Sequence, residues 1–155
     1  MATRRSTRAE ETRALLRAQK AGVISTVSAK LGGTPFGSLA SYALDARGQP
    51  VFLFSALAQH TQNLAADPRA SLFVWDTAAS PDDPQQAPRA CLAGKVSALD
   101  GADAEAARAA FLARHPQAEP WLQLDFRFYR LAVEEVQFVG GFAQASWIRA
   151  EEILD

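Results

Sequence analysis

The segment Asp45-Ala-Arg-Gly-Gln-Pro-Val-Phe-Leu-Phe54 carries the strongest signal for the fold. Its first four residues predict a tight turn, because aspartate and glycine readily accept turn geometry. The run from Val51 to Phe54 then presents apolar side chains to both faces of a strand. Such a strand is expected where a barrel interior lies on one side and a covering element lies on the other.

Similar short apolar runs lie on both sides of this segment and are separated by turn signals. Leu31-Gly-Gly33 predicts a hairpin turn upstream, and Gly140-Gly141 closes the last long run downstream. The expected strands are Val23–Ser28, Phe36–Leu44, Val51–Phe54, Ser71–Trp75, Cys91–Leu99 and Phe126–Val139.

Helix signals are fewer and lie between these runs. Thr7 and Glu10 have the spacing of a capping box, so a first helix is expected from Thr7 to about Ala21, with Gly22 as its C-terminal cap. Further expected helices are Ala58–Ala66, Ala102–Arg114 and a short tail helix from Arg149. Residues 77–88 predict an exposed loop. We therefore expect a mainly β (α+β) antiparallel barrel with two or three surface helices. It should form one domain over residues 1–155, with residues 1–6 as a flexible tail.

Composition excludes several classes of protein. The formal net charge of −1 argues against a general nucleic-acid binder. No apolar run approaches the ~20 residues that span a bilayer, and the N-terminus lacks the apolar part of a secretory signal. Cys91 is the single cysteine and is expected to be a small core residue. These features favour the cytoplasm.

Familiar catalytic and nucleotide-binding motifs are absent from the sequence. There is no phosphate-binding loop, no G-x-G-x-x-G turn and no G-x-S-x-G elbow. His60 and His115 lie far apart in sequence without a second ligand at metal spacing, so no metal site is expected. His115 precedes a proline at a helix end and is expected to face solvent.

Two segments could carry chemistry. In Thr34–Tyr42, the small residues Gly37, Ser38, Ala40 and Ser41 would let another group approach the strand backbone. That group could be a flat heteroaromatic ring. The same residues could equally allow tight packing of the first helix or of a partner subunit.

The second segment, Ser55–Asn63, leads from a strand end into a helix start, where free N–H groups and the helix dipole favour anions. Ser55 and Thr61 add hydroxyl donors, and His60 could donate in its neutral or its protonated form. A phosphate group would fit such a site. A solvated polar helix start with Gln59 and His60 exposed remains the alternative.

In this order, these segments resemble the FMN-binding split-barrel superfamily of pyridoxamine 5′-phosphate oxidase, and most closely its bacterial heme-utilisation branch. The resemblance spans roughly residues 10 to 150. The residues that carry it are Gly22–Ser28, Pro35–Ser38, Tyr42–Asp45, Ser55–Leu64, Asp67–Leu72, Arg130-Leu131, Val136–Phe138, Gly140–Phe142 and Trp147.

The resemblance implies a homodimer of split barrels with FMN between the subunits. It places the strand residues Gly37, Ser38, Leu39, Ala40 and Ser41 beside the flavin ring. It assigns the phosphate end to Ser55, Gln59, His60 and Thr61. Phe142 and Trp147 would approach the flavin from the partner chain, although Trp147 could instead belong to the dimer core.

The chain also departs from the superfamily pattern. Gln59-His60 stands where the oxidase has an Arg-Lys pair, and Gln62 and Gln144 stand where branch relatives place basic residues. Each lost charge-assisted bond costs ~1–3 kcal/mol, so FMN should bind weakly. The expected function is a flavin-dependent oxidoreductase whose small-molecule redox substrate is unknown. One alternative is a heme-binding or heme-degrading protein with His60 or His115 as ligand. The other is a dimeric module that has lost its cofactor.

Overall fold

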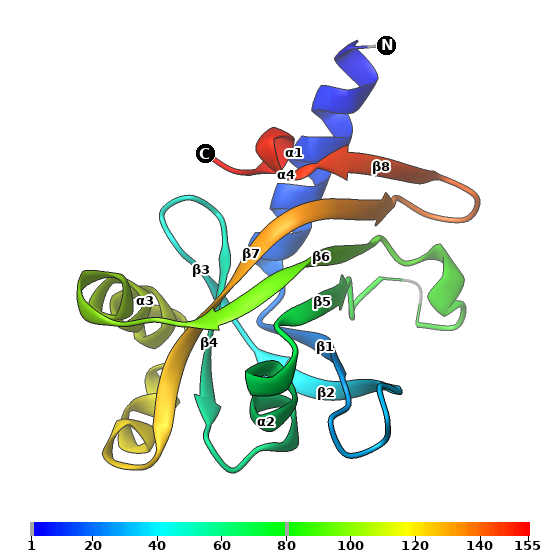
Figure 1. Cartoon of the computed structure of the whole chain (residues 1–155). Coiled ribbons are helices and arrows are strands. Elements are labelled where there is room, and N and C mark those ends of the chain that lie inside the picture. Colours follow the sequence, from blue (N-terminus) through cyan, green and yellow to red (C-terminus); the bar gives the residue numbers. More distant parts are fainter. Residues whose placement is uncertain (1, 80) are drawn as a thin grey trace.

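In the computed structural model, an eight-stranded antiparallel sheet curls into a split barrel, as expected (Figure 1). The structure describes residues 2–79 and 81–155, with side chains from residue 7 onward. The strands are β1 (Ala21–Val27), β2 (Pro35–Ser41), β3 (Ala43–Leu44), β4 (Pro50–Ser55), β5 (Arg69–Trp75), β6 (Arg89–Ala98), β7 (Phe126–Val139) and β8 (Ala145–Arg149). Their order is β2-β1-β5-β6-β7-β4-β3, and β8 pairs with the far end of β7.

Helices close the ends and one side of the barrel. They are α1 (Ala2–Ala18), α2 (Gln59–Ala66), α3 (Gly101–Arg114) and α4 (Ala150–Ile153), with the 3-10 helices η1 (Pro84–Gln86) and η2 (Pro116–Gln123). Helix α2 packs against β1 and β2 at one end of the barrel, whereas β8 lies at the other end (Figure 1).

The predicted bounds of the first helix are wrong at both ends. Helix α1 begins at Ala2, not near Thr7, and no glycine or proline interrupts residues 2–6. It ends at Ala18, and Gly22 lies inside β1. A Cβ atom at Gly22 would collide with the carbonyl oxygen of Phe73, so this glycine allows close strand pairing and is no helix cap. Met1 and the side chains of residues 1–6 lie outside the described part, and the flexibility of that tail stays a prediction.

One row of buried side chains crosses the sheet and forms the centre of the core. The strand registers align Ile24, Leu72, Leu92, Val136 and Ile148 on β1, β5, β6, β7 and β8. Each of these side chains is at most 1% exposed. Successive residues of a strand point to opposite faces, so burying this row turns its chain neighbours to the outside. We call these five residues the inner row.

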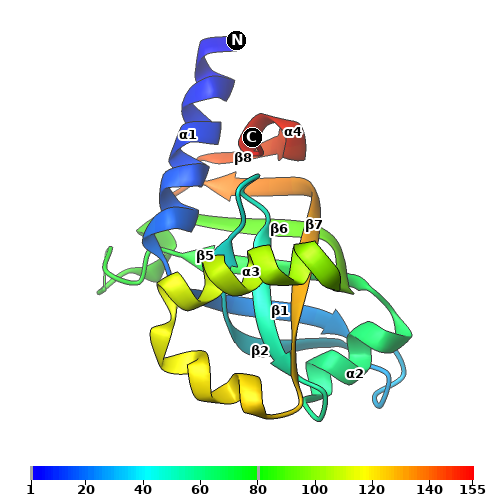
Figure 2. The same ribbon diagram turned by 90° about the vertical axis from the view of Figure 1, so that its left-hand side faces the viewer.

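Strand β4 is buried on both faces, which confirms the prediction from Val51–Phe54. Phe52 and Phe54 join the barrel interior, and their rings stack with centroids 5.0 Å apart. Val51 and Leu53 join a second core beneath helix α3, which includes Phe111. Figure 2 shows α3 lying across the sheet in front of β3, β4 and β7.

His115 does not face solvent, contrary to expectation. The chain turns into η2 directly after α3 and folds the imidazole inward, where it is 3% exposed. Its Nε2 lies 2.7 Å from the carbonyl oxygen of Tyr42, and its ring packs on Phe111. Because a carbonyl oxygen can only accept, Nε2 carries the proton of this hydrogen bond. His115 therefore ties α3 to the start of β3.

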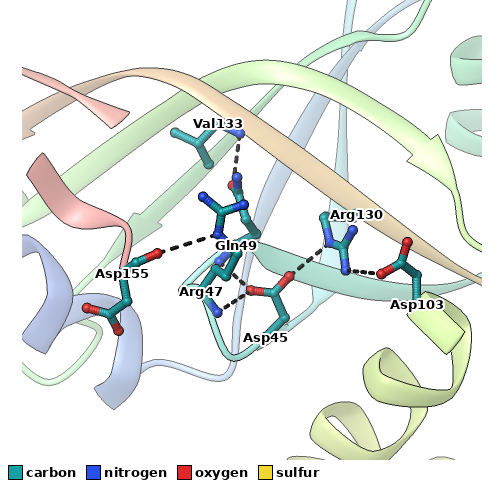
Figure 3. A network of polar contacts seen from close by, with 7 residues as sticks. All are labelled: Asp45, Arg47, Gln49, Asp103, Arg130, Val133 and Asp155. Atoms are coloured by element: carbon teal, nitrogen blue, oxygen red, sulfur yellow. Dashed lines mark hydrogen bonds and ion pairs between the residues drawn. The ribbon is translucent and has the colours of Figure 1, made fainter. Parts of the chain in front are cut away.

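A polar network fixes the turn between β3 and β4 (Figure 3). The Asp45 carboxylate accepts hydrogen bonds from two N–H groups of its own turn and pairs with Nε of Arg130 at 2.9 Å. Arg130 also reaches Asp103 of α3 at 3.5 Å. The Gln49 amide oxygen accepts from the N–H of Val133 at 3.0 Å. The network therefore joins the predicted Asp45–Gly48 turn to β7 and to α3.

Cys91 and two short elements also differ from the sequence expectations. Strand β8 and helix η2 were not predicted, because their short polar segments depend on packing against β7 and α3. Cys91 is half-buried on the outer side of β6 and does not belong to the core. The expected exposed loop is confirmed for residues 77–79 and 81–88 apart from the single 3-10 turn of η1 and the buried side chain of Ala87.

Leu92 in the inner row gives a direct test of this core. Leu92→Ala should lower the free energy of unfolding by ~2–5 kcal/mol, because the surrounding strands cannot close over the cavity. Lys95→Ala on the exposed side of the same strand is the matched control and should change it by less than ~0.5 kcal/mol. Urea titration followed by circular dichroism measures both. Equal losses in the two variants would contradict the assignment of the inner row.

Candidate functional site

The connection from β4 to helix α2 forms the most chemically unusual part of the described chain. We call the residues from Ser55 to Thr61 the α2 mouth. Ala58 occupies the position before the first helical residue, and no side chain caps the helix start. The first N–H groups of a helix have no intrahelical partner. The α2 mouth therefore offers donor groups to a ligand, as expected from the sequence.

Two polar side chains of the α2 mouth are buried without a hydrogen-bond partner among the described residues. They are His60 at Nε2 and Thr61 at Oγ1. Thr61 is 7% exposed, and the His60 ring meets the ring of Phe54 edge-on with centroids 4.4 Å apart. A buried polar atom without a partner costs free energy. Such atoms are expected where a ligand completes a site.

The surroundings of His60 favour the neutral form of its imidazole. Burial against Phe54 lowers the pKa of His60 below its ordinary value, because desolvation disfavours the charged ring. Without a ligand, the geometry therefore supports the neutral role of His60 and does not favour the protonated one.

The other polar side chains of the α2 mouth are already engaged. The Ser55 hydroxyl donates to the Asp125 carboxylate at 2.9 Å and accepts from the N–H of Leu57 at 3.2 Å. The Gln59 amide turns along the helix and donates to Asn63 at 3.0 Å. Two of the four residues expected to hold a phosphate therefore have protein partners.

Asn63 anchors the α2 mouth to the barrel. Its fully buried side chain donates to the Thr26 hydroxyl at 3.0 Å and accepts from the N–H of Ala29 at 3.1 Å. These two bonds fix helix α2 against β1 and the turn that follows it. The position of His60 and Thr61 therefore follows from a buried amide one turn further along the helix.

The five predicted ring-binding residues lie together on β2, which is an edge of the sheet. Alternation divides them between two faces: Gly37, Leu39 and Ser41 point outward, whereas Ser38 and Ala40 point inward. A Cβ at Gly37 would lie 3.3 Å from the side chain of Val23, so the glycine leaves the surface of β2 free of a side chain at this position. Helix α2 packs beside β2, so the helix that carries His60 and Thr61 and the strand that carries these five residues are neighbours in one subunit.

A second row of side chains runs across the outside of the sheet, and we call it the outer row. Its residues are paired by strand register across β2, β1, β5, β6, β7 and β8, in the order Leu39, Val23, Phe73, Cys91, Gln137 and Trp147. The four central members are half-buried, whereas the two end members, Leu39 and Trp147, are 78% and 65% exposed. Apart from Gln137 the row is apolar, and a largely apolar strip on a sheet face is typical of an interaction surface.

Phe142 and Trp147 lie far from the other predicted site residues in one subunit. Trp147 is on β8, and the 69%-exposed Phe142 lies in the loop before it. Five strand spacings separate β8 from β2, which is about 24 Å measured along the curled sheet. A single chain therefore brings the α2 mouth and β2 together but does not bring Phe142 or Trp147 to them.

Sequence reasoning missed Asp125 and the outer row. Asp125 directly precedes β7, whose Phe126 pairs with Ser55 of β4. Only the register of that pairing, which the sequence did not specify, places the carboxylate beside Ser55. The outer row depends in the same way on the combined registers of six strands.

Residues 2–79 and 81–155 contain no group of three or more His, Cys, Asp or Glu side chains that could hold a metal ion. In the same ranges, no helix has the length and apolar character needed to cross a membrane.

The lowered pKa of His60 predicts a pH dependence of stability. The unfolded chain, with an ordinary histidine pKa near 6.5, binds a proton more readily than the native chain does. The free energy of unfolding should therefore fall as the pH is lowered through this value, and His60→Gln should weaken that fall. Urea titrations between about pH 5 and pH 8, an interval that brackets the ordinary histidine pKa, measure this pH dependence of the free energy of unfolding. Wild-type and variant curves of identical slope would show that His60 is not desolvated.

Sequence and structure comparisons place the barrel among known proteins. The CREG, beta-barrel family matches residues 3–154. The chloroplastic heme oxygenase HOZ of Arabidopsis thaliana is 39% identical over 88% of this chain, which spans only 41% of that protein. The solved structure of a heme-binding protein from Mycobacterium smegmatis has a TM-score of 0.86 and 34% identity. That match covers 94% of this chain and 59% of the mycobacterial one.

A more distant structure supports the fold alone. It is a Clostridium acetobutylicum protein of the pyridoxinephosphate oxidase family, with a TM-score of 0.72 and 12% identity over 96% of this chain and 98% of its own. The expected split barrel and the resemblance to this superfamily with its heme-related branch are confirmed. From these matches, the chain belongs to the CREG β-barrel family.

Proposed function

We propose that two copies of this chain pair through their outer rows. The row is apolar at its centre and ends in two exposed side chains, Leu39 and Trp147. In a two-fold symmetric pair the same patch contacts itself, so an axis near Phe73 and Cys91 would set Leu39 of one copy opposite Trp147 of the other. Strands β2 and β8, which lie about 24 Å apart along the sheet of one chain, would then lie next to each other across the pair.

The proposed pair binds a planar aromatic cofactor, and heme is the occupant that the relatives support best. Two proteins above 30% identity carry heme in their names, as an oxygenase and as a binding protein. The α2 mouth and β2 of one copy would form one wall of the site. Phe142 and Trp147 of the second copy would form the other.

The chain's own groups suit this role. His60 is neutral and its Nε2 has no described partner, which is the state of imidazole that binds iron. His115 has committed its Nε2 to Tyr42. Heme iron, when bound, supplies redox and dioxygen chemistry. The apolar outer rows would keep water away from the ring.

FMN is the second candidate, and one observation favours it: Thr61 and His60 leave unpartnered polar atoms at an uncapped helix start. FMN would supply hydride or electron transfer, as expected for a flavin-dependent oxidoreductase. Its phosphate fits less well, because Ser55 and Gln59 already have protein partners. FMN would therefore bind weakly.

Titration with hemin tests the proposed function. Wild-type protein should shift and sharpen the Soret band of hemin until its binding sites are saturated. His60→Ala should give a different band or no shift. His115→Ala is the comparison variant, and it should retain the wild-type spectrum wherever it remains folded by circular dichroism. A flat hemin titration together with a positive FMN titration would favour the second candidate. Failure of both cofactors to bind would favour the cofactor-free module.

The proposed pairing has its own test. Phe73→Glu places a charge at the centre of the outer row, where it would be buried against its own copy. Sedimentation velocity should give a species of two 16.7 kDa chains for the wild type and of one chain for the variant. Leu124→Glu changes an exposed leucine outside the outer row and should remain paired. A wild-type protein that sediments as one chain would refute the pairing.

A further inference from the structure

Asp125 occupies the position at the α2 mouth where an anionic ligand would need a donor. Its carboxylate oxygens lie 2.9 Å and 3.2 Å from the Ser55 hydroxyl. A serine hydroxyl has a single proton to donate. The oxygen of Ser55 also accepts from the N–H of Leu57, so both of its hydrogen-bonding roles are in use. A phosphate could bind Ser55 only by displacing the carboxylate.

The position of Asp125 is set by the backbone as well as by its side chain. The carbonyl oxygen of Asp125 accepts from the N–H of Ala56 at 3.3 Å, and the next residue, Phe126, pairs with Ser55. The carboxylate is therefore tied to the α2 mouth at two adjacent points.

Other charges near the α2 mouth do not offset this carboxylate. The first turn of α2 reads Gln59, His60, Thr61, Gln62 and contains no arginine or lysine. Burial lowers the pKa of His60 and so disfavours a positive charge there. Arg127, two residues beyond Asp125, pairs with Asp100 at 2.9 Å. The mouth therefore presents helix N–H groups beside a negative side chain.

We propose that Asp125 sets the charge selectivity of the α2 mouth, which opposes a terminal phosphate dianion. The mouth accepts a planar-ring ligand whose end at this point is neutral and can donate a hydrogen bond to the carboxylate. This inference rests on the proposed cofactor site. It concerns the second candidate ligand, a flavin: a flavin ring ending in a hydroxyl is preferred over the same ring ending in a phosphate.

Flavin fluorescence titrations with FMN and with riboflavin test the proposal, because the two ligands differ only in the phosphate. The wild type should bind riboflavin at least as tightly as FMN. Asp125→Asn keeps an oxygen that can accept from Ser55 and removes the charge. It should tighten FMN binding about tenfold and leave riboflavin within about twofold, as expected when one solvent-exposed carboxylate is removed from beside a phosphate dianion.

Asp82→Asn removes the same charge from the exposed 77–88 loop and is the matched control, which should leave both affinities unchanged. Addition of Ser55→Ala to Asp125→Asn should leave most of the gain for FMN, because the gain comes from removal of the carboxylate charge and not from the Ser55 hydroxyl. The proposal is overturned if Asp125→Asn binds FMN no more tightly than wild type, including the case of no binding. It is also overturned if Asp125→Asn increases the affinity for FMN and for riboflavin by the same factor. The hemin titration is a separate measurement, so failure of the proposed function can be distinguished from failure of this inference.

Discussion

Burial of the inner row is the constraint on which the rest of the structure depends. Ile24, Leu72, Leu92, Val136 and Ile148 come from five strands and meet in one line. Full burial of each such side chain contributes roughly 1.5–3 kcal/mol. A register slip of one residue in any strand would turn that strand's member outward, so the row fixes the pairing of the whole sheet. The exposed outer row is the necessary consequence, because it occupies the alternate positions of the same strands.

The same constraint explains why the candidate site is divided. The α2 mouth lies at one end of the barrel, anchored to β1 by the buried amide of Asn63. Trp147 lies across the sheet on β8, at the far end of the outer row. One chain cannot bring these regions together, whereas a two-fold pairing of outer rows can. In the proposed pair, the Asp125 carboxylate at the α2 mouth would then restrict what the completed site accepts.

Much of this fold could be predicted from the sequence. Hydrophobic alternation and turn chemistry located six strands, and the doubly apolar run of β4 correctly predicted a core on each of its faces. Features set by non-local packing could not be predicted: β8 forms only by pairing with β7, and His115 is buried only because η2 folds it onto Tyr42. The residues of β2 and the α2 mouth were predicted as two separate motifs, and α2 packing makes them neighbours. Asp125 could not be found, since its partner depends on the register between β4 and β7.

Sedimentation velocity recorded at the Soret wavelength tests the central claim most directly, because it reports the mass of only those particles that carry heme. With hemin present in less than stoichiometric amount, the account predicts that the Soret absorbance sediments with a species of two 16.7 kDa chains. Soret absorbance that sediments with a single chain, or stays with free hemin, would contradict a cofactor site completed by the second copy.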